Sequence, residues 1–241
     1  MTNDELAFRP SSFVRKVMVH VTKTPDPARE EILGKVRMAL LRRIDAPVPP
    51  VPSSARVAPR TPGAARVEIE LLLDEIGKLG GYTRRIARRD EMKSALAELV
   101  KAEAIKKATT WETAELAELG VADSLRGLGV ELVSPQADRR QLAECDLGVT
   151  SVDAALPETG TLLLRSAPER PRLVSLLPRV HLALVRPSAL RADLSQAFGD
   201  VKNDGYFVFV TGPSRTADIE LTVTIGVHGP KALYVWAIEH P

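Results

Sequence analysis

The sequence predicts an α/β fold with a mainly parallel sheet and helices on both of its faces. Three observations lead to this class. Helical stripes alternate with short apolar runs through the middle of the chain. The runs 182–185 and 206–210 are continuously apolar, as strands covered on both faces usually are. Helices separate the early runs, whereas the middle runs have hairpin-like spacing, which predicts an antiparallel portion in addition.

The composition predicts one large domain, or one domain that carries a smaller appendage. The chain has 241 residues, of which 44% are hydrophobic, 4% are aromatic and one is a cysteine, Cys145. A net charge of +2 with few aromatic residues argues against a nucleic-acid partner. One thiol holds neither a disulfide nor an iron–sulfur cluster, so we expect no metal and no cofactor bound by this chain alone. No run suggests a membrane span or a signal peptide, which predicts a cytoplasmic protein.

Residues 1–62 are predicted to be an N-terminal arm with an amphipathic helix and a proline-rich linker. The helix begins at Asp26 and Pro27, and its apolar residues recur at every fourth position: Ile32, Val36, Leu40 and Ile44. An apolar stripe is normally buried against another surface, so we expect the helix to pack on the body of the chain or on a second copy. Six prolines between residues 46 and 62 exclude a helix or an inner strand there, so the domain boundary is placed at 62/63.

Residues 63–241 are predicted to form the α/β domain. Its first helix carries Leu72 and Ile76 and ends at Gly80, the next is capped by Asp90, and a third pattern over 114–128 is interrupted at Gly120. The predicted strands are 82–87, 108–111, 130–133, 147–151, 161–164, 173–177, 181–185, 206–211 and 233–238.

Three polar stretches next to predicted strands are the candidate sites. Ligands of open α/β sheets bind beyond the carboxyl ends of strands, where we expect these stretches to lie. In the first, Glu158 is a candidate acid, base or nucleophile, and Thr159, Gly160 and Thr161 are candidate ligand contacts; a plain turn explains the same residues equally well. In the second, His181 is a candidate proton carrier, although a lone histidine at the start of a strand is more often structural.

The third stretch has the most polar groups. A glycine and serine loop with one guanidinium suits a carboxylate or phosphate, whereas a helix cap in which Arg215 pairs with a nearby carboxylate is the alternative. The candidate ligand-binding residues are Gly212, Ser214, Arg215, Thr216, Asp218 and Glu220, and His228 in a following turn. His181 and His228 together lack the spacing of metal ligands.

The stretches 158–161, 177–181, 212–220 and 226–230 together resemble the LUD domain (lactate utilization) family. The resemblance covers the chain from about Ala28 to its C-terminus and implies a fold similar to the NagB/RpiA/CoA-transferase-like group. It also implies a role in oxidising L-lactate to pyruvate, beside partner proteins that carry iron–sulfur clusters. Because the chain lacks a cysteine-rich region, it resembles the cluster-free member, which is not a redox centre by itself.

Two functions therefore stay open at this point. The first is a cluster-free subunit of an L-lactate oxidation system that binds a small anionic ligand at the 212–220 loop. The second is a stand-alone enzyme, similar to CoA transferases or sugar-phosphate isomerases, that uses Glu158. The second likeness is one of fold, which does not carry function.

Overall fold

The computed structural model describes residues 27–44, 60–199, 205–216 and 224–239. The chain divides into two compact units, Met1–Arg56 and Val57–Pro241. In the first unit, helix α1 (Pro27–Ile44) forms where the stripe predicts a helix. Its stripe residues Ile32, Val36 and Leu40 are all exposed, at 62%, 48% and 59%. The side chain of Ile44 lies outside the described residues, and the expected packing of this stripe stays a prediction.

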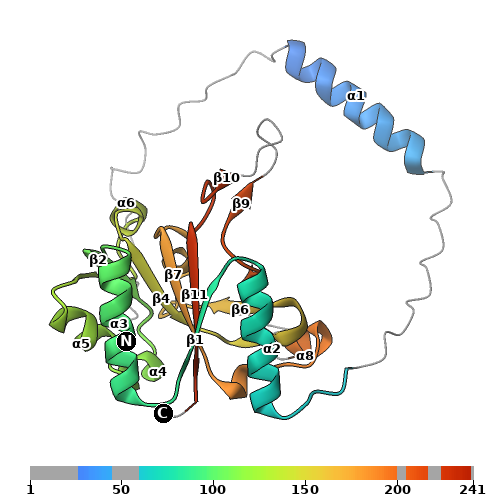
Figure 1. The fold of residues 1–241 in the computed structure, drawn as a ribbon. Coiled ribbons are helices and arrows are strands. Elements are labelled where there is room, and N and C mark those ends of the chain that lie inside the picture. Colours follow the sequence, from blue (N-terminus) through green and yellow to red (C-terminus); the bar gives the residue numbers. More distant parts are fainter. Residues whose placement is uncertain (1–26, 45–59, 200–204, 217–223, 240–241) are drawn as a thin grey trace, which may run out of the picture. The chain divides into compact units, whose positions relative to one another are not determined.

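A six-stranded parallel sheet forms the centre of the second unit (Figure 1), in the order β1-β11-β7-β4-β2-β3. The strands are β1 (Tyr82–Ile86), β2 (Lys107–Thr110), β3 (Glu131–Val133), β4 (Leu147–Ser151), β7 (Val180–Val185) and β11 (Ala232–Ile238). Every neighbouring pair is parallel. All of β4 and β7 is buried, as central strands of a covered sheet should be. The predicted α/β class is confirmed.

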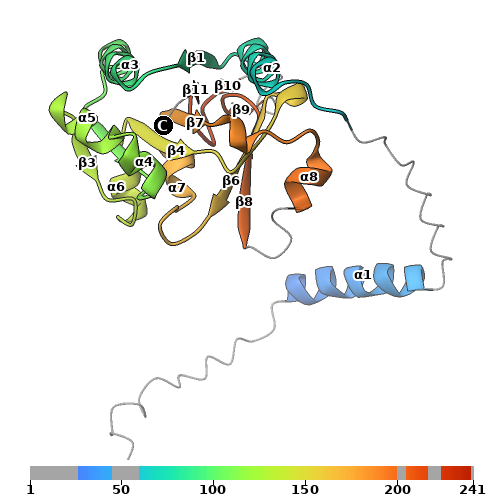
Figure 2. The same cartoon turned by 90° about the horizontal axis from the view of Figure 1, so that it is seen from below.

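Helices cover both faces of this sheet. The helices are α2 (Ala65–Lys78), α3 (Arg89–Ala102), α4 (Ala114–Glu118), α5 (Val121–Gly127), α6 (Arg139–Ala143), α7 (Leu173–Leu176) and α8 (Leu194–Gly199). Figures 1 and 2 show α3 and α2 on opposite sides of β1. On the face opposite to α3, helix α7 packs so closely that a Cβ at Gly148 would lie 1.9 Å from the carbonyl oxygen of Val174.

The antiparallel portion consists of two separate small sheets. Strands β5 (Ala154–Leu156), β6 (Thr161–Ser166) and β8 (Tyr206–Val210) pair in the order β5-β6-β8, and β9 (Arg215–Thr216) pairs with β10 (Thr224–Ile225). The three-stranded sheet lies on the same side of the main sheet as α2 (Figures 1 and 2). It brings the segment after β8 close to the amino ends of β7 and β11.

Three local predictions are wrong. The run 173–177 forms helix α7 and not a strand, because a short apolar run fits either structure and its residues pack as one turn over Gly148. The run 206–210 is the last strand of the small sheet, with Tyr206 and Phe209 exposed, so it is not covered on both faces. Helix α3 begins at Arg89 with Arg88 as its N-cap, and Asp90 lies in its first turn.

Candidate functional site

A cleft of about 140 Å³ opens at the amino ends of β7 and β11. Helix α7, strand β8, the loop after β8 and the turn before β11 form its walls. Its polar lining residues are Ser175, His181, Thr211, Ser214 and His228, and none of its described lining residues is Lys, Arg, Asp or Glu. The second and third predicted stretches therefore meet in one cleft, at the amino ends of the strands. The expected position at the carboxyl ends is wrong, because the strand before Gly212 belongs to the antiparallel sheet.

His181 lies at the inner end of this cleft. It is the second residue of β7 and only 1% exposed, and its Nε2 lies 2.9 Å from Oγ1 of Thr150 on β4. Burial lowers the pKa of the imidazole to about 4, so the ring is neutral at physiological pH. Its Nδ1 forms no hydrogen bond with any residue that the structure describes. The inner end of the cleft thus offers one neutral polar nitrogen.

The loop after β8 is held against the turn before β11 by backbone hydrogen bonds. The amide of Ser214 donates to the carbonyl of Pro230 at 3.0 Å, and the amide of Gly226 donates to the carbonyl of Ser214 at 2.9 Å. Gly212 has φ of +92°, a left-handed conformation that turns the chain into this loop. These bonds bring Ser214 and the exposed His228 to the outer part of the cleft.

Arg215, the guanidinium predicted to bind an anion, does not line this cleft. Its Nη2 donates to the carbonyl oxygen of Leu79, the residue that caps the C-terminus of α2. Thr216 pairs with Thr224 in the two-stranded sheet. Asp218 and Glu220 lie outside the described residues. The cleft is therefore lined by hydroxyl groups and histidines, but not by Arg215, which was predicted to bind the anion.

Glu158 lies on the surface, in the 3₁₀ turn Pro157–Thr159, with 59% of its side chain exposed. Its Oε1 forms an ion pair with Nε of Arg60, at a distance of 2.8 Å. Arg60 also binds the buried Glu68 through both of its terminal nitrogens, at 2.7 and 3.0 Å. The hydrogen bond from Arg60 lowers the pKa of Glu68. Glu158 thus stands outside the cleft, in an ion-pair cluster that fastens the segment at Arg60 to α2.

The threonines next to Glu158 connect to the cleft. Oγ1 of Thr159 donates to Oγ1 of Thr161 at 2.8 Å, which lies 2.9 Å from Oγ1 of Thr211 on the cleft wall. Gly160 has φ of +60°, and a Cβ there would lie 3.0 Å from the backbone nitrogen of Ile76. The glycine lets this turn approach α2, and the three hydroxyls form a chain that supports the cleft from one side.

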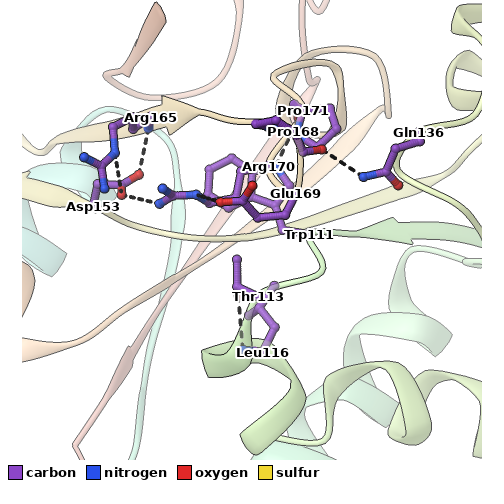
Figure 3. Close-up of polar contacts among 10 residues, drawn as sticks. All are labelled: Trp111, Thr113, Leu116, Gln136, Asp153, Arg165, Pro168, Glu169, Arg170 and Pro171. Carbon is purple, nitrogen blue, oxygen red and sulfur yellow. Dashed lines mark hydrogen bonds and ion pairs between the residues drawn. The ribbon is translucent and has the colours of Figure 1, made fainter. Parts of the chain in front are cut away.

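Residues 168–171, here called the crosspiece, contact residues that follow β2, β3 and β4 (Figure 3). Nε1 of Trp111 donates to the carbonyl of Pro171 at 3.0 Å, and Gln136 donates to the carbonyl of Pro168 at 2.9 Å. Figure 3 shows Arg170 reaching from the Trp111 ring to Asp153, whose Oδ1 lies 2.6 Å from Nη1 of Arg170. The guanidinium lies 5.9 Å from the ring centroid, within the range of a cation–π interaction.

A larger cleft of about 490 Å³ lies beside this crosspiece, after β4 and β7. Its charged groups are paired with one another or with the crosspiece: Arg186 contacts Glu115 at 2.8 Å and Glu118 at 3.2 Å, and Asp153 contacts Arg170. The charged groups of the larger cleft are paired with one another, whereas the smaller cleft brings two of the predicted stretches together. The smaller cleft is therefore the better candidate site.

Other features of the described residues bear on function class. Within them, no group of three or more His, Cys, Asp or Glu side chains could hold a metal ion. Cys145 is buried, and burial raises the pKa of its thiol to about 11, which suits a structural residue. None of the helices described has both the length and the hydropathy needed to cross a membrane.

Thr211 on the cleft wall, Thr150 and Ser175 were not among the site residues predicted from the sequence. Thr150 and Ser175 are fully buried hydroxyl residues that lie inside apolar runs. The only signal available was a polar residue at an inward position of a predicted strand, which many threonines and serines share.

Comparisons with known proteins agree with the fold and the motifs. The family model described as "LUD domain" matches residues 69–238. "Lactate utilization protein C" of Shouchella clausii is 33% identical over 156 residues, which cover 60% of this chain and 68% of that protein. The protein of the same name from Bacillus subtilis is 35% identical over 105 residues, or 40% of this chain and 44% of that protein.

A solved structure shows the same fold. It is a DUF162 family protein from Deinococcus radiodurans, with a TM-score of 0.52 and 17% identity, and the match covers 73% of this chain and 99% of that one. Since the family model spans most of the α/β unit and a relative agrees over two thirds of its own length, the chain belongs to the LUD domain family.

Proposed function

We propose that this chain acts in L-lactate utilization as the cluster-free subunit of a system that oxidises L-lactate to pyruvate. The observation that carries the proposal is the family match over residues 69–238 together with relatives named Lactate utilization protein C. A single cysteine in the sequence is too few for a thiolate-held cluster, so electrons would pass through iron–sulfur clusters on partner proteins. The purified chain should therefore show no iron–sulfur absorbance by itself.

We further propose that the cleft at the amino ends of β7 and β11 binds a small carboxylate. A carboxylate at the outer end would meet the exposed His228 and the hydroxyl of Ser214, the described part of the predicted 212–220 loop. The cleft volume of about 140 Å³ suits a ligand with a few heavy atoms.

The stand-alone enzyme that uses Glu158 receives less support. A covalent or proton-transfer role needs the carboxylate to face a bound substrate. Glu158 is largely exposed, is paired with Arg60 and does not line the cleft. We therefore propose a positional role for Glu158 and a ligand-binding role for the cleft.

Growth on L-lactate tests both proposals. Deleting the gene should abolish growth on L-lactate but not on an unrelated carbon source, and the wild-type gene should restore it. Ser214→Tyr, which fills the cleft, should fail to restore growth at normal protein levels. Ser94→Tyr on the exposed side of α3 is the control and should restore it. Growth of the deletion strain on L-lactate would refute the role in lactate utilization, whereas full rescue by Ser214→Tyr would refute only the cleft.

A further inference from the structure

We propose that the pair His181 and Thr150 recognises the 2-oxygen of a small 2-hydroxy or 2-oxo acid, with the Thr150 hydroxyl bound to Nε2 of the ring so that Nδ1 faces the ligand. The inference rests on the proposed function in one respect, because it takes the cleft to hold a small carboxylate. It adds the residues that recognise the 2-oxygen, His181 and Thr150.

The geometry places the pair on one face of the main sheet. His181 on β7 pairs with Gly148 on the neighbouring strand β4. Thr150 lies two residues after Gly148 on β4, so its side chain is on the same face of the sheet. Thr150 is fully buried and His181 is 1% exposed, so the contact of 2.9 Å between them is shielded from water. Because Gly148 has no side chain, α7 packs directly over this face and forms the wall that carries Ser175.

The second ring nitrogen of His181, Nδ1, is the atom that we expect to bind the ligand. Nδ1 forms no hydrogen bond within the described residues. It is not one of their fully buried atoms that lack a partner, so it is accessible from the cleft that His181 lines. The ring lines the cleft, so a polar atom of the bound molecule can supply that partner. The partner need not be charged, since the buried ring is neutral.

The ring has two neutral forms, and Thr150 is compatible with each. If the Thr150 hydroxyl donates to Nε2, then Nδ1 carries the proton and donates to a keto or hydroxyl oxygen of the ligand. If Thr150 accepts from Nε2–H, then the Nδ1 lone pair accepts from a hydroxyl of the ligand. The two forms differ only in which nitrogen carries the proton, and the ring is neutral in both. A 2-oxo acid fits only the first form, whereas a 2-hydroxy acid fits either.

The rest of the cleft orients the ligand. No described lining residue carries a fixed charge, and the inner end holds a neutral ring. A carboxylate is costly to bury without a charged partner, so it stays at the outer end near His228. The oxygen on the adjacent carbon then reaches His181, which is the arrangement of a three-carbon or four-carbon 2-hydroxy or 2-oxo acid.

Ligand titrations followed by NMR of the histidine nitrogens test this proposal on the full chain. The probes are L-lactate, pyruvate and propionate, which has the same carbon chain as L-lactate without the 2-oxygen. We expect L-lactate and pyruvate to shift the His181 nitrogens, with pyruvate giving the Nδ1–H form, and propionate to bind about tenfold more weakly. The His181→Gln spectrum assigns the resonances.

Thr150→Val and Thr109→Val form a matched pair of variants. Thr109 is also a fully buried threonine of the main sheet, but its hydroxyl has no hydrogen-bond partner within the described residues. We expect Thr150→Val to remove the preference for L-lactate over propionate, and Thr109→Val to keep it. If Thr150→Val does not fold, the comparison of the three acids on the wild-type chain decides the proposal without it.

Two results would overturn the proposal, and they differ in what else they reject. Equal binding of L-lactate and propionate, with no shift at His181, rejects the recognition of a 2-oxygen but keeps a carboxylate cleft. No binding of any of the three acids by the folded chain rejects the carboxylate cleft as well. Neither result changes the growth phenotype on which the role in lactate utilization depends.

Discussion

His181 shows how burial changes the chemistry that a residue type predicts. An ordinary imidazole titrates near neutral pH, which made His181 a candidate proton carrier. Burial lowers its pKa to about 4, so the ring is neutral at pH 7. A neutral ring serves as a hydrogen-bonding group and not as a proton carrier. Its position was predictable from the sequence, but its protonation state was not, because that depends on α7 and β8 packing around it.

The buried ring should make stability depend on pH between about 6.5 and 4. In this window the unfolded chain binds a proton at His181 that the folded chain does not, so the free energy of unfolding falls as the pH falls. The full effect is about 3 kcal/mol, from ~1.4 kcal/mol per pKa unit. Urea unfolding at pH 7 and pH 4.5 measures it, with His181→Gln as the comparison.

His181→Gln should show a smaller loss of stability between these two pH values than the wild-type chain, whatever its stability at pH 7. The Glu68 carboxyl, whose pKa the hydrogen bond from Arg60 lowers, is present in both proteins, so its own pH dependence cancels in this comparison. Equal pH dependence of the two proteins would show that His181 is not buried as a neutral ring.

At the scale of single elements, composition alone could not separate similar apolar runs. Residues 182–185 and 206–210 have the same continuous apolar pattern, yet the first is buried in the main sheet and the second is a half-exposed strand of the small sheet. Neighbouring strands decide burial, and the order of strands is a property of the fold. The run at 173–177 was equally ambiguous, because four residues fit one helical turn or a short strand.

The packing of α7 on β4 predicts a strong effect of one methyl group. In Gly148→Ala the new Cβ would lie 1.9 Å from the carbonyl oxygen of Val174, so α7 must move away from the sheet. We expect a loss of about 2–3 kcal/mol, which lowers Tm by roughly 5–10 °C in a domain of this size. Because α7 carries Ser175, ligand binding in the cleft should weaken too.

Gly127→Ala is the matched control for this change. Gly127 is the last residue of α5, and a Cβ there would meet no atom within 4 Å. Alanine favours helix over glycine, so Tm should stay the same or rise slightly. A Gly148→Ala chain as stable as Gly127→Ala would contradict the close packing of α7.

At the scale of the whole molecule, the alternation of helices and strands was enough to predict the α/β class and the positions of most strands. The order of the strands and the separation of the antiparallel sheets could not be predicted, since they depend on contacts between distant segments. For the same reason the sequence predicted three polar stretches but not that two of them share a cleft at the amino ends of the strands.

The contacts of Arg60 predict where the chain can be shortened. Arg60 precedes α2 and binds the buried Glu68 and the exposed Glu158. A chain lacking residues 1–56 keeps these contacts and should unfold at the same temperature as the full chain. A chain lacking residues 1–62 removes the Arg60 guanidinium and leaves the buried Glu68 carboxylate with the backbone nitrogen of Gly63 as its donor, which should cost about 1–3 kcal/mol.

Calorimetry of the two shortened chains measures this difference. Adding Glu68→Gln to the shorter chain removes the unpaired charge and should recover part of the lost stability. Equal melting temperatures for both shortened chains would show that Arg60 does not stabilise the α/β unit.

Strand β7 also sets a distance between two parts of the molecule that could be redesigned. His181 lies near its amino end and Arg186 directly follows its carboxyl end, so about 16 Å of buried strand separates the two clefts at ~3.3 Å per residue. Changes that far apart normally combine additively. An engineer could therefore rebuild the larger cleft around Arg186 for an unrelated ligand, and the small cleft would keep its own specificity.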